Sequence, residues 1–155
     1  MSKILSLDFE YEHDYTLIGI HSSLEDYRMA FFLNQSLNLK LERHKEDLDF
    51  EIYNCSFSLY DYENISSMTN WSLISNKYVN TEKLENNNDN LFKDESKTSY
   101  LIPEKKQVDF FIKIIGQINE KEIHDILLKI NNTKKIITSY TINPYNLKSK
   151  DFLIF

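Results

Sequence analysis

Glycine, proline and cysteine are scarce in this sequence, and two of these shortages exclude a type of site. Among 155 residues there are two glycines, two prolines and one cysteine. Gly19 and Gly116 lie 97 residues apart, so they cannot form a glycine-rich loop that binds phosphate groups. Cys55 stands alone and can form neither an intrachain disulfide nor a cysteine metal cluster, so we expect a reducing, cytoplasmic location.

Long hydrophobic runs and excess positive charge are also missing. No stretch approaches the ~20 apolar residues that a membrane-spanning helix needs. Acidic residues interrupt the N-terminal stretch where a signal peptide would have its apolar core. The net charge is −6, whereas nucleic-acid binding depends on Lys and Arg side chains that neutralise phosphates. Composition therefore argues against a membrane or a nucleic acid as partner.

Aromatic residues, in contrast, are plentiful. They make up 14% of the chain, and hydrophobic residues make up 41%, as is typical of a folded protein. The length fits one domain that spans residues 1–155. Residues 80–98 contain few apolar side chains and three successive asparagines, which predicts a flexible loop within that domain.

Strands are predicted where apolar and polar residues alternate, or where aromatic and β-branched residues concentrate. The run from Val108 to Ile115 is apolar on both faces, which is typical of a central strand covered on both sides. The predicted strands are Leu5–Tyr11, Tyr15–Ile20, Leu37–Leu41, residues 50–62, residues 70–79, Val108–Ile115 and residues 134–142.

Two helices are predicted, each from a capping box. Ser22 and Glu25 have this spacing and open a helix to about Gln35. Asn119 and Glu122 open the second helix. We expect the first helix to bury Tyr27, Ala30, Phe31 and Leu33. The second has a staple of Ile118 and Ile123, an apolar face of Ile123, Ile126, Leu127 and Ile130, and an end at Asn131–Asn132, where asparagine tolerates a left-handed conformation.

The two glycines indicate an internal repeat. Gly19 precedes Ser22 by three residues, and Gly116 precedes Asn119 by three, so a shift of 97 residues superposes both pairs. Each unit then reads strand, glycine turn, capped helix, strand. This pattern predicts an α+β fold of the ferredoxin-like sandwich type, with an antiparallel or mixed sheet, two main helices on one face and an inserted hairpin.

No pattern of catalytic, metal-binding or cofactor-binding residues is found. His13, His21, His44 and His124 are not spaced as metal ligands. Cys55 lies on an alternating strand, where a free cysteine behaves as a small core residue. We therefore expect no catalytic residue, no metal and no cofactor, and the sequence favours a protein that is not an enzyme.

A motif after the predicted loop carries a family resemblance. Tyr100–Ile115 reads YLIPEKKQVDFFIKII, and it resembles the signature of the IPExxxDY family of small, uncharacterised bacterial proteins. Phenylalanine replaces the tyrosine of that signature, and four residues separate the glutamate from the aspartate, where the signature has three. The matching residues are Ile102, Pro103, Glu104, Asp109 and Phe110, and Leu17–Asn34 and Leu147–Phe155 are also similar to the family. The resemblance implies no biochemical activity.

Two segments are candidates for contact with a partner. The turn formed by Pro103, Glu104, Lys105 and Lys106 is expected to be exposed, with Glu104 presented outwards, although Glu104 and Asp109 could instead satisfy amides of the turn. The C-terminal run Phe152–Phe155 is apolar, so it either packs on the domain or inserts into a partner.

Three functions follow as hypotheses. The favoured one is a non-enzymatic cytoplasmic protein that acts through contacts with an unknown protein partner or as a homodimer. The first alternative is a regulatory module that binds a small ligand near the turns Gly19–Ser22 and Gly116–Asn119. The second is a ribosome- or RNA-associated factor that uses Lys105–Lys106 and Lys134–Lys135.

Overall fold

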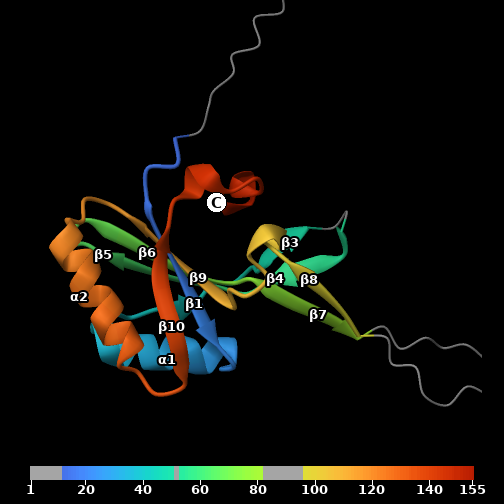
Figure 1. Cartoon of the computed structure of the whole chain (residues 1–155), viewed down its shortest axis with the longest axis horizontal. Coiled ribbons are helices and arrows are strands. Elements are labelled where there is room, and N and C mark those ends of the chain that lie inside the picture. The colour runs from blue at the N-terminus through green and yellow to red at the C-terminus, as the bar shows by residue number, and fades with distance from the viewer. Residues whose placement is uncertain (1–11, 51–52, 82–95) are drawn as a thin grey trace, which may run out of the picture.

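The computed structural model describes residues 12–50, 53–81 and 96–155, and these form one α+β arrangement (Figure 1). The predicted strand Leu5–Tyr11 lies outside the described residues. So does most of the predicted loop at 80–98, whose outer parts belong to strands. No helix among the described residues has the length and apolar character needed to cross a membrane.

A six-stranded sheet forms the centre of the protein. Its strand order is β10-β1-β9-β6-β5-β2, and all of its pairings are antiparallel. The strands are β1 (Thr16–Ser22), β2 (Glu42–Arg43), β5 (Leu59–Asn64), β6 (Thr69–Ser75), β9 (Phe110–Ile115) and β10 (Ile136–Ile142). β1 lies between β10 and β9, so the first strand of one predicted strand–helix unit pairs with both strands of the other.

Strand β9 is buried on both faces, as its sequence predicts. Phe110 and Ile112 face one apolar cluster, and Phe111 faces the other. Since side chains alternate along a strand, one continuous apolar run supplies both clusters.

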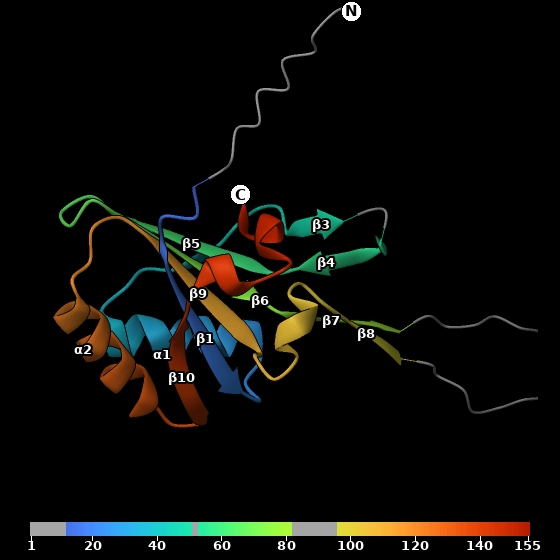
Figure 2. The same ribbon diagram turned by 45° about the horizontal axis from the view of Figure 1, so that its top comes forward.

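The helices α1 (Asp26–Leu37) and α2 (Glu120–Asn131) contribute to the same cluster, which lies against one face of the sheet (Figure 2). Residues of this cluster include Ile18, Leu33, Leu73, Ile112 and Ile130. Two helices against an antiparallel sheet agree with the predicted α+β class.

The start of α1 differs from the prediction. Glu25 is the N-cap residue and makes no side-chain capping bond. Ser22 is the last residue of β1, where its hydroxyl accepts from the Leu24 amide (3.1 Å) and donates to the Lys135 carbonyl (2.7 Å). The predicted capping box is therefore wrong, because a partner distant in sequence occupies the serine.

The buried face of α1 is also rotated from the predicted one. Tyr27 and Phe31 are more than half exposed, whereas Met29 joins Ala30 and Leu33 in the core. Positions 29, 30 and 33 fall on one helical face, and aromatic residues at 27 and 31 fall outside it.

The predicted strand Leu37–Leu41 is wrong as well. Leu37 ends the helix, and Asn38 closes it in the left-handed conformation (φ 54°). Leu39 and Leu41 are buried in a loop, where the Asn34 side chain binds both the amide and the carbonyl of Leu41. Leu39 and Leu41 alternate with polar residues because their side chains are buried, although this segment pairs with no described strand.

Helix α2 begins as predicted. The Asn119 side chain accepts from the Glu122 amide (2.8 Å), and the Glu122 carboxylate accepts from the Asn119 amide (3.0 Å). Ile118 packs against the core cluster. The end differs in one detail, since Asn132 adopts a right-handed conformation and Lys135 carries the positive φ (66°).

The two glycines have different roles, which contradicts their superposition. Gly19 lies within β1 and pairs with Phe111 and Tyr140 on its two sides. Gly116 follows β9 with φ +130°, a conformation that side-chain-bearing residues rarely adopt. Only the second unit contains the predicted glycine turn.

Two hairpins and the C-terminal segment cover the other face of the sheet (Figures 1 and 2). The prediction of one inserted hairpin was therefore incomplete. Leu153 is fully buried there, and Ile154 and Phe155 are about 40% exposed, so the C-terminal run packs on the domain. The elements are β3 (Leu48–Phe50), β4 (Cys55–Phe57), β7 (Lys77–Thr81), β8 (Ser96–Tyr100) and the short helices η2 (Pro103–Lys105), η3 (Pro144–Asn146) and η4 (Lys150–Leu153).

The glycines provide a test of the fold. A methyl group at Gly116 would lie 2.7 Å from the Met68 carbonyl oxygen in a strained backbone, whereas one at Gly19 would meet only side-chain methyl groups, those of Ile142 (2.8 Å) and Val108 (3.2 Å), in an unstrained one. We expect Gly116→Ala to lower the free energy of unfolding by about 1–3 kcal/mol, and Gly19→Ala to change it by less than about 1 kcal/mol. Urea unfolding measures both, and equal losses would contradict the assignment.

Candidate functional site

The turn predicted from the signature lies at the surface, between β8 and β9. Pro103 opens η2, where its missing amide proton leaves no bond unmade. Pro103, Glu104 and Lys106 are exposed, and Lys105 is partly buried. On either side of the turn, Ile102 and Val108 are fully buried. The turn is therefore an exposed loop with both ends anchored in the core.

Asn76 holds this turn from beneath, and sequence reasoning missed it. Its side chain is fully buried and accepts a hydrogen bond from the Ile102 amide (2.8 Å). The same side chain donates to the carbonyls of Lys105 (2.9 Å) and Val108 (2.8 Å). Its main chain binds the Asp109 carbonyl and the Leu101 amide. An asparagine between two apolar strand patterns is a sequence signal for a buried polar residue. Its partners lie about 30 positions away, so the sequence does not identify them.

Glu104 is engaged with the C-terminal segment. Its carboxylate accepts from the amide (2.8 Å) and the hydroxyl (2.9 Å) of Ser149. Partial burial raises the pKa of the Glu104 carboxyl, but the hydrogen bonds from the amide and hydroxyl of Ser149 outweigh this, so the pKa lies below its ordinary value. Within the turn, Lys105 and Lys106 are thus the charged side chains that have no hydrogen-bonding partner among the described residues.

Asp109, the second acidic residue of the signature, joins three elements. Its carboxylate accepts from the Ser22 amide (2.8 Å) and forms an ion pair with Lys77. Lys77 and Lys106 both lie over the ring of Tyr100, at 6.0 Å and 5.7 Å from its centroid. Next to the signature residues, Lys77 and Lys106 thus lie around the ring of Tyr100.

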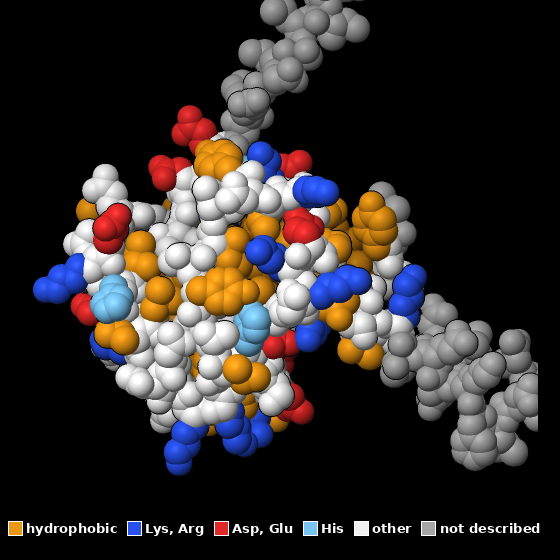
Figure 3. Space-filling view, in the orientation of Figure 1, with side chains coloured by type: hydrophobic (Ala, Val, Ile, Leu, Met, Phe, Trp, Pro, Cys, Tyr) orange, Lys and Arg blue, Asp and Glu red, His pale blue; other side chains and the backbone are white. Residues whose placement is uncertain are grey.

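An apolar cavity lies next to this turn. Its volume is about 370 Å³, it is open to solvent on one side, and its walls come from the two hairpins, the start of the turn and η4. Pro103 and Tyr100 belong to both the turn and the cavity wall. In Figure 3, hydrophobic side chains and lysines are interleaved over the region of β7 and β8.

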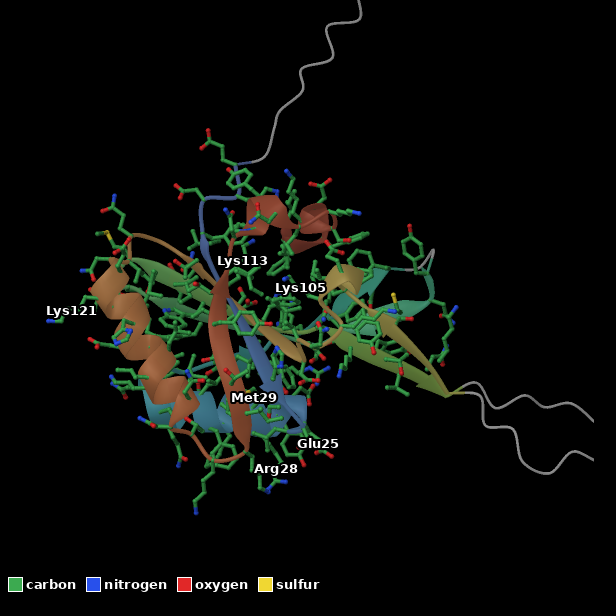
Figure 4. All side chains as sticks on the ribbon, in the orientation of Figure 1. Glu25, Arg28, Met29, Lys105, Lys113 and Lys121 are labelled. Carbon is green, nitrogen blue, oxygen red and sulfur yellow. The ribbon has the colours of Figure 1, made fainter. Side chains whose placement is uncertain are left out.

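Lys113 is a buried cation on the central strand β9. It is 1% exposed, and its ammonium group donates to the Leu153 carbonyl (2.6 Å). The rings of Tyr15 and Phe155 lie 4.7 Å and 4.3 Å from this group. Burial lowers the pKa of Lys113. Figure 4 shows Lys113 beneath the C-terminal segment, which the bond to Leu153 attaches to the sheet.

The histidines do not come together. His13 is buried, binds Tyr15 through its ring, and has a pKa lowered first by burial and then by Lys150. His21 binds the Tyr140 hydroxyl (2.9 Å). Among the described residues, no three His, Cys, Asp or Glu side chains are grouped so that they could hold a metal ion. Burial raises the pKa of the Cys55 thiol, which keeps it protonated.

The two turns proposed for a small ligand lie at opposite ends of the sheet. Strands β1 and β9 are antiparallel, with Thr16 beside Ile114 and Ile20 beside Phe110. The turn after Ser22 is therefore far from Gly116, and the two helix starts do not form one site. Near the first turn lies a polar cleft of about 580 Å³ whose walls include the ion pair of Arg43 and Asp47, in which Nη2 of the arginine donates to both carboxylate oxygens.

The lysine pairs proposed for RNA share their end of the sheet with an acidic residue. The Lys135 carbonyl binds Ser22, and the Ser22 amide binds the Asp109 carboxylate. Lys105 and Lys106 belong to the turn that leads to Asp109.

The free edges of the sheet are protected in different ways. β2 is two residues long and charged. β10 is longer, but the Asn131 side chain accepts from the amide and the hydroxyl of Ser139 in its middle. A side-chain cap of this kind blocks pairing with another strand at that point.

The protein class that the structure defines is an α+β domain with a six-stranded antiparallel sheet and two helices. In comparisons with known proteins, no protein-family model, no curated protein and no solved structure matched this chain. The resemblance to the IPExxxDY family stays a prediction, and function is inferred from geometry.

The Asn76 contacts lead to a stability prediction. Asn76→Ala removes the partners of the Ile102 amide and of two buried carbonyls, each of which costs about 1–3 kcal/mol when unsatisfied. We expect the free energy of unfolding to fall by about 3 kcal/mol or more in urea titrations. Exposed Asn70 on β6 is the control, with an expected change within about 0.5 kcal/mol for Asn70→Ala. Equal effects of the two variants would show that the hydrogen bonds of the Asn76 side chain, which we call the Asn76 clamp, do not stabilise the fold.

Lys113 leads to a prediction about pH. At neutral pH the folded protein holds a charged, desolvated lysine whose pKa lies below the ordinary 10.5. As pH rises through the lowered pKa towards 10.5, the folded state loses this proton before the unfolded state does, so stability rises. The free energy of unfolding should therefore increase between pH 7 and 10 relative to Lys113→Met. Lys121→Met should follow the wild type, and a parallel profile for Lys113→Met would contradict the assignment.

Proposed function

We propose that this protein is a non-enzymatic cytoplasmic protein that acts by binding another protein, and that its contact surface is the exposed turn Pro103–Lys106. The partner segment that fits this turn is acidic. The single observation that carries the proposal is the buried Asn76 clamp, which fixes an otherwise exposed loop in one conformation. A loop that is already ordered loses little conformational entropy on binding.

Charge supports the choice of an acidic partner. The chain carries a net charge of −6, yet Lys105 and Lys106 stand together on the turn, while nearby Lys77 is already paired with Asp109. Charged groups at an interface favour a complementary partner and raise the rate of association. Glu104, which the sequence suggested as the presented group, is assigned instead to holding Ser149.

The family and the fold type belong to the same proposal. The position of the Ile-Pro-Glu motif at an anchored turn supports membership of the IPExxxDY family, whose signature would then serve to shape a docking loop. The order β1–α1–β6 followed by β9–α2–β10 supports a ferredoxin-like sandwich, with β5, β2 and the hairpins as additions.

The test is affinity purification of the tagged protein from its host, with mass spectrometry and RNA detection. We expect a protein partner that is captured by the wild type and whose recovery falls at least about tenfold with the double variant Lys105→Glu, Lys106→Glu, since reversed charges repel an acidic segment. Capture should also weaken as salt rises.

Lys121 on α2 provides the control, because it is exposed and lies away from the turn (Figure 4). Lys121→Glu alone changes the net charge by half as much as Lys105→Glu, Lys106→Glu does. The control is therefore the double variant Lys121→Glu, Lys129→Glu, which changes the net charge by the same amount. Equal capture by all variants, or recovery of a lone monomer, would overturn the proposal. Recovery of nuclease-sensitive complexes would replace it with the RNA alternative, and recovery of a homodimer would replace the partner with a second copy.

A further inference from the structure

We propose that the cavity between the two hairpins binds a small amphipathic anion, with an aromatic or medium-length aliphatic body and a carboxylate head. This site borders the docking turn through Pro103 and Tyr100, but the proposal does not rest on protein docking there. The cavity volume of about 370 Å³ falls in the range of about 300–1,000 Å³ that small-molecule sites occupy.

The walls select an apolar body. Phe50 and Phe57 come from the first hairpin, Tyr100 from the second, and Phe152 from η4. The rings of Phe50 and Phe152 meet edge to face, with centroids 5.1 Å apart, and those of Phe50 and Phe57 lie 6.0 Å apart. Aromatic walls that already pack against each other form a preshaped apolar space for a flat ring or an alkyl chain.

The charge at the cavity selects the head group. Lys97 on β8 is the only charged residue among those that line the described part of the cavity, and it is exposed. Ser99 and Tyr53 add hydroxyl groups at the lining. No carboxylate belongs to this lining, so a cationic ligand would find no counter-charge. One ammonium group with hydroxyl donors matches a single carboxylate, and a polyphosphate would need more cations.

Cys55 makes occupancy measurable. It lines the cavity and is the only cysteine in the chain, so alkylation by N-ethylmaleimide, which is slow at this buried thiol and is followed over hours, gives one mass increment that reports on this place alone. A ligand in the cavity should block access to the thiol. With a ligand at ten times its dissociation constant, about one molecule in eleven stays empty, so alkylation should slow about tenfold.

The experiment compares three probes on the full chain, by calorimetry and by Cys55 alkylation followed with intact mass. Decanoate is expected to bind and to slow alkylation about tenfold. Nonyltrimethylammonium, with the same nine-carbon chain and the opposite charge, should bind at least about tenfold more weakly, and butyrate should not protect Cys55. Absence of decanoate binding, or equal binding of the cationic probe, would overturn the proposal.

Variants assign the head group and the body separately. Lys97→Met should weaken decanoate binding about two- to fivefold, as expected for an exposed ion pair, and Lys97→Glu should weaken it further. Lys121→Met, on α2, should leave it unchanged. Ser99→Phe should fill the cavity and abolish protection of Cys55, with circular dichroism to verify folding. Because Lys97 is exposed, its variants test the site even where Ser99→Phe does not fold.

One further comparison separates this site from the docking turn. The variant Lys105→Glu, Lys106→Glu should retain decanoate binding, since neither lysine lines the cavity. Unchanged decanoate binding by Lys97→Glu would overturn the assignment of the head group.

Discussion

One buried amide group connects the parts of this protein that meet at the candidate site. Asn76 separates β6 from β7, where the chain leaves the central sheet for the second hairpin. Its main chain and side chain bind five main-chain groups between Leu101 and Asp109. The hairpin, the turn and the start of β9 therefore share one hydrogen-bonding centre. Each of these groups sits beside apolar core, where an unmade hydrogen bond is costly, so the position of the turn is set by the need to satisfy Asn76 and its partners together.

The two faces of the sheet are built differently, and this difference places the binding features on one of them. Helices α1 and α2 close one face with a continuous apolar cluster. Short hairpins and the C-terminal segment cover the other, and short elements leave a space between them that a helix would fill. The same elements bring lysines to the surface of an acidic protein. Lys113 extends this pattern into the interior, where aromatic rings and one carbonyl stabilise its charge.

Sequence patterns succeeded where structure depends on near neighbours. The capping box at Asn119 and the doubly buried strand β9 follow from residues within a few positions, and both are present. Ser22 has the same local pattern as Asn119 but binds Lys135, which lies 113 positions away, so its pattern misled. Glu104 and Ser149 are 45 positions apart, and the partners of Asn76 are about 30 away, so no local signal indicates these contacts. The cavity likewise arises from three elements that only the tertiary structure brings together.

The position of β1, between the late strands β9 and β10, has a consequence for biosynthesis. Gly19 pairs with Phe111 on one side and Tyr140 on the other, so both partners of this strand leave the ribosome long after it does. During translation the apolar side chains of β1 lack both of their neighbouring strands, β9 and β10, while more than half of the chain is synthesised. Pairings between such distant segments form slowly and leave apolar strands open to aggregation in the meantime. Because β9 and β10 are made late, the two sheet neighbours of β1 are both available only once Ile142 has been synthesised, close to the end of the chain.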